Sequence, residues 1–379
     1  MNIKKQNKGI TLVALIITII VLLILAGVVI ALALNEDGII EKTSNSIQAY
    51  EVEELKEYIS LIRTEKLMEN TNITDFELGN YIKDRIEASG KLDKFNCKIK
   101  STVLIIDDEI VISLLNPTTP LVEGDPEEWH YSIRDNEVAW VSGYKGTDTE
   151  ITIPECIVEN GKKYPVVRIN MPWNSAIEFR SNSDLQSVVI PNTVETIESW
   201  VFSSLNNLKT VVLPSSLQVL GIGAFNNSGI EKIKIPDSIT VLEEEAGTGI
   251  LSNCSNLKEI EFSRNLTVIP EFFANNCGAL EKIVLYEGLK EIRKFAFANT
   301  TGLKSVELPN SLTTIGEQAF VGLHNIEQNL TIPTTVVDIG SNAFTSFALN
   351  TKGARNIKIF VPNDFVITDQ FPMDIVERY

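Results

Sequence analysis

The side chains that most often carry chemistry are few in this chain of 379 residues, and they form no catalytic pattern. The only two histidines, His130 and His324, have neither metal-ligand spacing nor a nucleophile motif beside them. Gly221-Ile-Gly223 resembles part of a phosphate loop, but it lies inside a repeated pattern that accounts for both glycines. The sequence therefore predicts a non-enzymatic protein with no catalytic residue, no cofactor and no metal site.

Two other groups were candidates for chemistry. Cys254 and Cys277 each precede the first leucine of a repeat by three residues, and stacked repeats place such positions about 4.8 Å apart. That separation overlaps the range of a disulfide, so a bridge stays open, although two small buried thiols are favoured. The acids from Asp107 to Glu109 lack a spaced ligand set, and we expect a solvated turn there.

Charge excludes one class of partner. The formal net charge is −17, from 33 basic and 50 acidic residues. Nucleic-acid binding needs a basic face, so we expect no nucleic-acid partner.

Binding is the remaining chemistry, and a repeated pattern would position it. From about residue 185 the chain repeats with a period near 23 residues, which is typical of a solenoid. The repeats begin at Leu185, Leu208, Ile230, Leu257, Leu280, Leu303 and Ile326. The clearest copy contains Leu303, Val306, Leu308, Pro309, Ser311, Leu312, Ile315, Gly316, Ala319 and Phe320.

Each copy predicts one short strand followed by a turn and a buried aromatic residue. In the Leu303 copy, Val306 and Leu308 alternate and point inward. Pro309 ends the strand because it cannot donate to a ladder, and Ala319-Phe320 close the far side of the coil. A lone repeat cannot offset the entropy of ordering its backbone, so neighbours must stack and unfold together.

Residues that point outward from these strands form the predicted binding face. They are Thr210, Val212, Lys232, Lys234, Glu259, Glu261, Lys282, Val284, Ser305 and Glu307. Lysines and glutamates alternate along this face, and opposite charges on adjacent strands attract by roughly 0.2–1 kcal/mol each. A charge ladder that satisfies itself is the alternative to a ligand footprint.

Two copies depart from the pattern. The Ile230 copy loses Ala-Phe and gains an acidic and glycine-rich stretch from Glu243 to Gly249. The Leu257 copy has Ser263 in place of proline and Phe272-Phe273 at the aromatic position. An insertion in one coil often marks the binding face, and a tolerated irregular coil is the alternative.

The N-terminal region predicts a membrane anchor. Residues 10–34 carry no charge, and as a helix they would span about 37 Å at 1.5 Å per residue. That length crosses a hydrocarbon core of ~30 Å, so we expect a transmembrane helix in contact with membrane lipid. Lysines precede it and acids follow it, which places the repeats outside the cell.

The start of the chain resembles a prepilin-type leader. Lys8-Gly9 is followed by Ile10-Thr11-Leu12-Val13. The resemblance implies a prepilin peptidase as partner and cleavage between Gly9 and Ile10. Ala14 stands where most pilins carry the glutamate that aids assembly, so the sequence favours plain anchoring over filament formation.

Between the anchor and the repeats we expect a small α+β, pilin-like module at residues 35–115. It contains a helix from Ile39 to about Asn70, a second from Thr74 to Ala88, and a strand pair at Val103–Ile106 and 110–114. The first helix either packs on its own module or continues the membrane helix. Residues 116–128 hold three prolines among acids and predict a semi-rigid linker.

From Trp129 to Val361 the chain resembles the BspA-type leucine-rich repeat proteins of bacterial surfaces, on the strength of the repeated pattern. The complete prediction is a basic leader (1–9), a transmembrane α-helix (10–34), the small α+β domain, the linker, and a leucine-rich-repeat β-solenoid with its cap (129–379). The resemblance implies a membrane-anchored surface protein that binds a protein or glycan outside the cell. A minor pilin or pseudopilin that displays the repeats is the alternative.

Overall fold

The computed structural model describes residues 39–379 except for 71–72, 74, 93–96, 101, 107–109, 118, 173–177, 246, 348–356, 364–365, 367–370 and 372–375. Two compact units make up the chain, residues 1–56 and 57–379. Gly9, Ile10 and the predicted transmembrane helix lie outside the described residues. Among the helices within the described ranges, none has the length and apolar content to span a membrane.

Two helices lie where the sequence predicts them. α2 spans Ile39–Glu69 and α3 spans Asp75–Ala88. Leu78, Ile82 and Ile86 recur every four residues on α3 and are buried, so one stripe of this helix faces a core. Lys66 of α2 lies 4.6 Å from the ring centroid of Tyr81 on α3.

A small antiparallel sheet follows the helices. Its order is β1-β2-β3, with bounds Cys97–Lys100, Val103–Ile106 and Ile110–Ser113. The predicted strand pair is confirmed as β2 and β3, whereas β1 was not predicted. All four residues of β2 are buried, as expected for the central strand.

The segment predicted as a linker is bound to the repeats along part of its length. β4 (Glu123–Gly124) pairs in parallel with β8 (Cys156–Glu159), and Leu121 is buried. The Val122 carbonyl accepts hydrogen bonds from the backbone N–H groups of Glu155 and Cys156, at 2.8 and 3.2 Å. These bonds hold a segment that its prolines alone would leave extended.

The repeat region opens with longer strands. They are β5 (Trp129–Arg134), β6 (Val138–Tyr144), β7 (Glu150–Thr152), β8 and β9 (Lys162–Ile169). β5 and β6 form an antiparallel hairpin, and β6 and β9 pair in parallel. Trp129 and Tyr144 pack at 5.0 Å between ring centroids in this opening layer.

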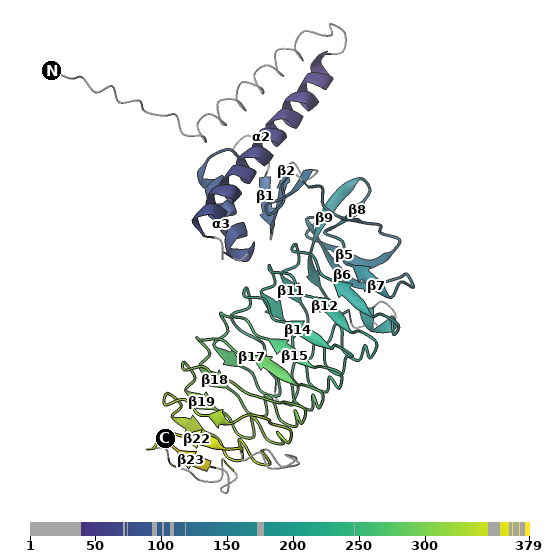
Figure 1. Cartoon of the computed structure of the whole chain (residues 1–379). Coiled ribbons are helices and arrows are strands. Elements are labelled where there is room, and N and C mark those ends of the chain that lie inside the picture. The colour runs from purple at the N-terminus through teal and green to yellow at the C-terminus, as the bar shows by residue number, and fades with distance from the viewer. Residues whose placement is uncertain are drawn as a thin grey trace, which may run out of the picture. The chain divides into compact units, whose positions relative to one another are not determined.

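The predicted repeat strands form one parallel sheet, here called the first sheet (Figure 1). Its order is β7-β10-β12-β14-β15-β17, and the last five strands span Ser187–Val189, Thr210–Val212, Lys232–Lys234, Glu259–Glu261 and Lys282–Val284. The central residue of each strand is buried, so the flanking residues point outward as the alternation predicts.

The first sheet ends one coil earlier than predicted. Residues 303–308 form no strand. The backbone there makes one hydrogen bond to the preceding coil, from the Lys304 N–H to the Glu281 carbonyl at 3.2 Å, and one to the next coil, from the Glu327 N–H to the Lys304 carbonyl. One bond to each neighbour is too few for a ladder, so the strand predicted from Leu303, Val306 and Leu308 is wrong, although Val306 is buried as expected.

A second ladder of very short strands, which was not predicted, lines another side of the coils. Here β9-β11-β13 and β16-β18-β19-β21 are called the second sheet. The short strands are Thr196–Ile197, Val219–Leu220, Val268–Ile269, Glu291–Ile292, Thr314–Ile315 and Asp338–Ile339. In each the second residue is buried and the first faces outward. The interruption between β13 and β16 falls at the irregular Ile230 coil.

A column of phenylalanines fills the core of the coils. Phe202 and Phe225 stack at 5.5 Å between ring centroids, and Phe320 stacks on Phe297 and Phe344 at 5.4 Å each. All of these rings are fully buried. The first of the series, Phe179, lies in the 3-10 helix η2 (Phe179–Ser181). The predicted role of Ala-Phe as the seal is confirmed in the coils that carry the pair, such as Ala319-Phe320.

The last coils are covered by a three-stranded sheet in the order β20-β22-β23. Its strands are Leu330–Thr331, Ile359–Val361 and Val376–Arg378. Phe371 continues the ring column by stacking on Phe344 at 5.4 Å, and the Tyr379 hydroxyl donates to the Ile332 carbonyl at 2.8 Å.

Candidate functional site

The first sheet brings eight of the ten predicted binding residues onto one face. Parallel register aligns Lys232, Glu259 and Lys282 in one row and Lys234, Glu261 and Val284 in the next. Thr210 pairs in register with Lys232, and Val212 stands on the same strand as Thr210. The two remaining residues, Ser305 and Glu307, lie in the coil that follows the sheet. The outward side chains of β7, β10, β12, β14, β15 and β17 are called the first-sheet face.

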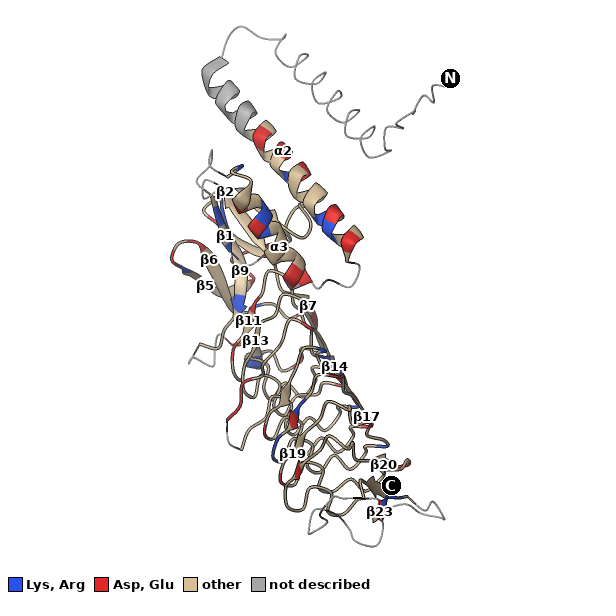
Figure 2. Cartoon of the chain, turned by 90° about the vertical axis from the view of Figure 1, so that its left-hand side faces the viewer, with Lys and Arg blue, Asp and Glu red and all other residues tan. Residues whose placement is uncertain are grey.

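The charged part of this face is paired within itself. Glu259 accepts from Lys282 at 2.7 Å and from Lys232 at 3.0 Å. These two hydrogen bonds hold the pKa of the Glu259 carboxyl below its usual value, the Lys282 bond being the larger cause. Figure 2 shows basic and acidic residues together at β14 and β17. Because the side chains of Lys232 and Lys282 are more than 60% exposed, each pair contributes only about 0–1 kcal/mol to stability.

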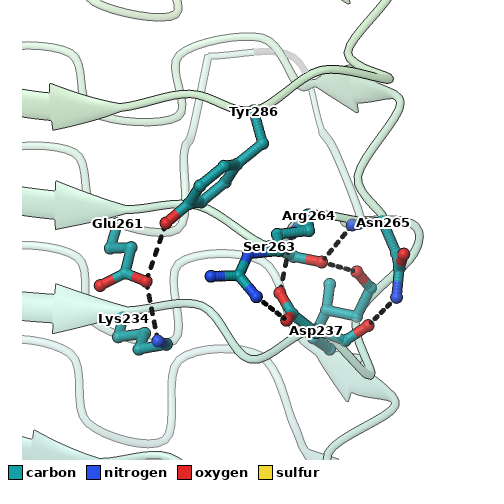
Figure 3. Close-up of polar contacts among 8 residues, drawn as sticks. Lys234, Asp237, Glu261, Ser263, Arg264, Asn265 and Tyr286 are labelled. Carbon is teal, nitrogen blue, oxygen red and sulfur yellow. Dashed lines mark hydrogen bonds and ion pairs between the residues drawn. The ribbon is translucent and has the colours of Figure 1, made fainter. Parts of the chain in front are cut away.

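The second row is hydrogen-bonded to a tyrosine, Tyr286. Glu261 pairs with Lys234 at 2.7 Å and accepts from the Tyr286 hydroxyl at 3.1 Å (Figure 3). The Lys234 bond lowers the pKa of Glu261, and the same bond raises the pKa of Lys234. The Arg264 guanidinium lies over the Tyr286 ring, 5.1 Å from its centroid. The charge ladder that the sequence left as an alternative is therefore present in the structure.

The Leu257 coil, which lacks the strand-ending proline, is joined to the preceding coil by polar contacts instead. The Ser263 hydroxyl donates to the Ile239 carbonyl at 2.7 Å, and the Asn265 amide donates to the Asp237 carbonyl at 2.7 Å (Figure 3). The Asp237 carboxylate accepts from the Arg264 N–H at 2.8 Å. Ser216 makes the same kind of bond, to the Val194 carbonyl, in a regular coil. The Leu257 coil therefore keeps this serine bond to the preceding coil, and donates it from the position where the proline is missing.

In the Ile230 coil, which is the other irregular coil, different residues fill the core. The Ile250 carbonyl accepts from Phe225 N–H at 3.0 Å, as the Ala224 carbonyl accepts from Phe202 N–H at 2.9 Å. Ile250-Leu251 therefore occupy the Ala-Phe position, and both are buried. The predicted loss of Ala-Phe from this coil is confirmed, and the buried pair Ile250-Leu251 replaces it after the extra residues.

At the aromatic position of the Leu257 coil, the two phenylalanines have different environments. Phe273 is fully buried, whereas Phe272 is half-buried in the left-handed region at φ 55°. Phe272 stacks on Phe295 at 4.9 Å, outside the main column. Only one of the two residues predicted for the aromatic position is therefore in the core.

The β10–β12 end of the first-sheet face carries exposed valines, of which only Val212 was among the predicted binding residues. Val189 and Val212 are 38% and 50% exposed there, and Val122 is 53% exposed. Two cavities of about 490 Å³ each adjoin them, and Val212 lines both. This end of the face offers apolar contact beside the paired charges.

A polar joint lies at the edge of these cavities. The Ser215 hydroxyl donates to Asp75 Oδ2 at 2.5 Å, and the Asn192 amide donates to the same oxygen at 3.3 Å. Asp75 is the first residue of α3, so its carboxylate also lies at the helix end that favours negative charge. Asp75 is more than 100 positions from both of its partners, so no local sequence pattern could have predicted these contacts.

The cysteines and histidines show no catalytic arrangement. Cys254 and Cys277 are free and buried, and each thiol donates to a backbone carbonyl at 3.1 Å. Burial raises the pKa of Cys156 to about 12, and burial with Lys145 nearby lowers the pKa of His130. The described part of the chain holds no group of three or more His, Cys, Asp or Glu residues that could bind a metal ion.

Comparison with known proteins identifies the repeat. Residues 175–292 and 269–358 match the family model described as BspA type leucine rich repeat region, in six copies. This match confirms the predicted repeat type over those residues. No curated protein matches the chain.

Three solved bacterial structures are similar to this chain. A leucine-rich repeat protein from Bacteroides ovatus is 19% identical and covers 66% of this chain and 98% of its own, with a TM-score of 0.28. The T. pallidum leucine rich repeat protein is 21% identical and covers 60% and 90%, with a TM-score of 0.39. A leucine rich cell surface protein from Faecalibacterium prausnitzii is 18% identical and covers 62% and 96%, with a TM-score of 0.27.

Proposed function

We propose that this chain is a non-enzymatic bacterial surface protein, anchored in the membrane by residues 10–34, whose repeats bind a protein or glycan outside the cell. The observation that carries the proposal is the BspA-type repeat region behind an uncharged segment of 25 residues. Stacked repeats expose extended surfaces and are used mainly for binding.

The surface of the repeats supports binding over catalysis. The charged row of the first-sheet face is paired, as at Lys232 and Glu259, and it lies beside exposed apolar residues at Val189 and Val212. Protein interfaces commonly combine an apolar centre with a polar rim. Ser305 and Glu307 extend the polar side of the same region in this proposal.

Protease treatment of intact cells tests the location. The proposal expects the chain to lose its repeats, detected with an antibody against the C-terminal residues, while a cytoplasmic marker stays intact. Retention of the repeats in intact cells, with digestion after lysis, would contradict it.

Processing at Gly9 separates anchoring from assembly. The minor-pilin hypothesis requires a mature chain that begins at Ile10 and is found in sheared filaments. Plain anchoring requires the chain to stay in the membrane fraction after shearing. Sequencing the mature N-terminus and fractionating sheared cells distinguishes the two, and an intact leader excludes the prepilin peptidase as a partner.

A further inference from the structure

A cavity of about 300 Å³ lies on the outer side of the second sheet, away from the predicted binding residues. Three of its lining residues are the outward residues of adjacent strands: Arg168 on β9, Thr196 on β11 and Val219 on β13. Trp200 and Glu243 line it as well. Glu243 belongs to the extra residues of the Ile230 coil, so the insertion supplies part of the wall of this cavity.

Trp200 supplies the aromatic ring of this cavity. Its φ is 68°, in the left-handed region, and this conformation belongs to the repeat. Later coils place Phe272, Phe295, Gln318 and Asn342 at the same position, also at positive φ. The equivalent residue of the next coil is Gly223, where a Cβ would approach the Trp200 ring to 2.8 Å. The fold therefore accepts aromatic, polar and small residues here, and in this coil the residue brings an indole ring to the cavity.

The charges of the cavity leave one carboxylate unpaired. Arg168 binds Glu198 at 3.0 Å, and the other oxygen of Glu198 accepts from the Met171 N–H at 3.2 Å. Glu244, next to Glu243, pairs with Arg293. Glu243 itself is exposed, and no described residue binds its carboxylate. The cavity is thus lined by Arg168, whose charge is neutralised by Glu198, by the Trp200 ring, and by the Glu243 carboxylate, which has no partner among the residues that the structure describes.

We infer that this cavity binds the side chain of a lysine or arginine that projects from a protein partner. The apolar stem of that side chain lies against Met171 and Val219, and its cationic head lies between the Trp200 ring and the Glu243 carboxylate. A cation over tryptophan is the strongest of the cation–π pairs. The net charge of −17 attracts a basic partner and repels an acidic one. The inference rests on the proposed function, because it names the partner chemistry for one place on the repeats.

A peptide titration of the full chain in detergent micelles tests this assignment. The probe is a fluorescent Gly/Ser peptide with one central lysine, compared with the same peptide carrying norleucine. We expect the lysine peptide to bind at least about fivefold more tightly. Trp200→Asn and Glu243→Gln should each remove most of this preference. Asn is tolerated at the equivalent position of a later coil, so Trp200→Asn should fold, which far-UV circular dichroism checks.

Asp338→Asn is the matched control, because it removes the same charge from an exposed outward position of the second sheet, on β21. It should leave the preference unchanged. Equal weakening by Asp338→Asn and Glu243→Gln, or equal binding of the two peptides, would overturn the inference. A neutral chitin hexasaccharide that binds the wild type and not Trp200→Asn, without any lysine preference, would also overturn it in favour of a glycan. None of these results changes the surface location, so the proposed function is tested separately.

Discussion

Removing one ring from the phenylalanine column should loosen the coils around it. Phe320 is fully buried and stacks on Phe297 and Phe344 at 5.4 Å on each side. Phe320→Ala leaves a cavity that the stacked coils cannot close, and such changes cost about 3–5 kcal/mol. Phe320→Leu keeps most of the apolar area and loses two aromatic contacts of roughly 0.5–1.5 kcal/mol each, so about 1–3 kcal/mol in total.

Hydrogen exchange of the full chain, read by mass spectrometry, measures this cost locally. The Phe320 N–H donates to the Ala343 carbonyl at 2.9 Å, so its protection reports the contact between the two coils. A loss of 3–5 kcal/mol accelerates exchange by roughly two to three and a half orders of magnitude, at 1.4 kcal/mol per tenfold. Val337→Ala is the control, because Val337 is 80% exposed and its truncation should cost no more than ~0.5 kcal/mol. Acceleration of less than tenfold in Phe320→Ala would refute the column as a main source of stability.

Three other outcomes test the joint, the charge ladder and the thiols. Asp75→Ala should lower the free energy of unfolding by about 1–3 kcal/mol, because it leaves two donors without their acceptor; Asp84→Ala, an exposed change on the same helix, should lower it little, and thermal unfolding compares them. The folded pKa of Glu259 is lowered, so its ion pairs stabilise the fold above its unfolded pKa of ~4.3 and this stability is lost as pH falls through the folded pKa. Glu259→Gln should therefore be the less stable protein at neutral pH and equal to the wild type in acid, as urea unfolding at several pH values will show. Cys254 and Cys277 should react with a thiol reagent only after unfolding, and without prior reduction; a need for reductant would indicate a disulfide.

The features that recur in every repeat were predictable, because the same local sequence pattern occurs in several copies. The inward residues of the first-sheet strands and the buried Ala-Phe pair follow from alternation and burial alone. The second sheet was missed because each of its strands has only two residues, such as Thr314–Ile315, which is too short for an alternation to be read.

The rest depends on contacts that the local pattern does not contain. The bonds of Val122 to the repeats and of Asp75 to Ser215 join residues far apart in the chain. The ion pairs of the first-sheet face were foreseen as an alternative, since register follows from the repeat length. The cavity beside Glu243 needed the structure, because it depends on where the insertion folds.

Labelling of a single introduced thiol tests the central claim, that the repeats are displayed outside the cell, most directly. This readout needs one exposed side chain and no cleavage of the chain. Val337→Cys places one at a site that is 80% exposed. Cys156, Cys254 and Cys277 are buried, and the partly exposed Cys97 is replaced by serine in both the variant and its reference. We predict that a membrane-impermeant maleimide labels Val337→Cys equally in intact and lysed cells, well above the reference. Labelling of this variant only after lysis would contradict the account.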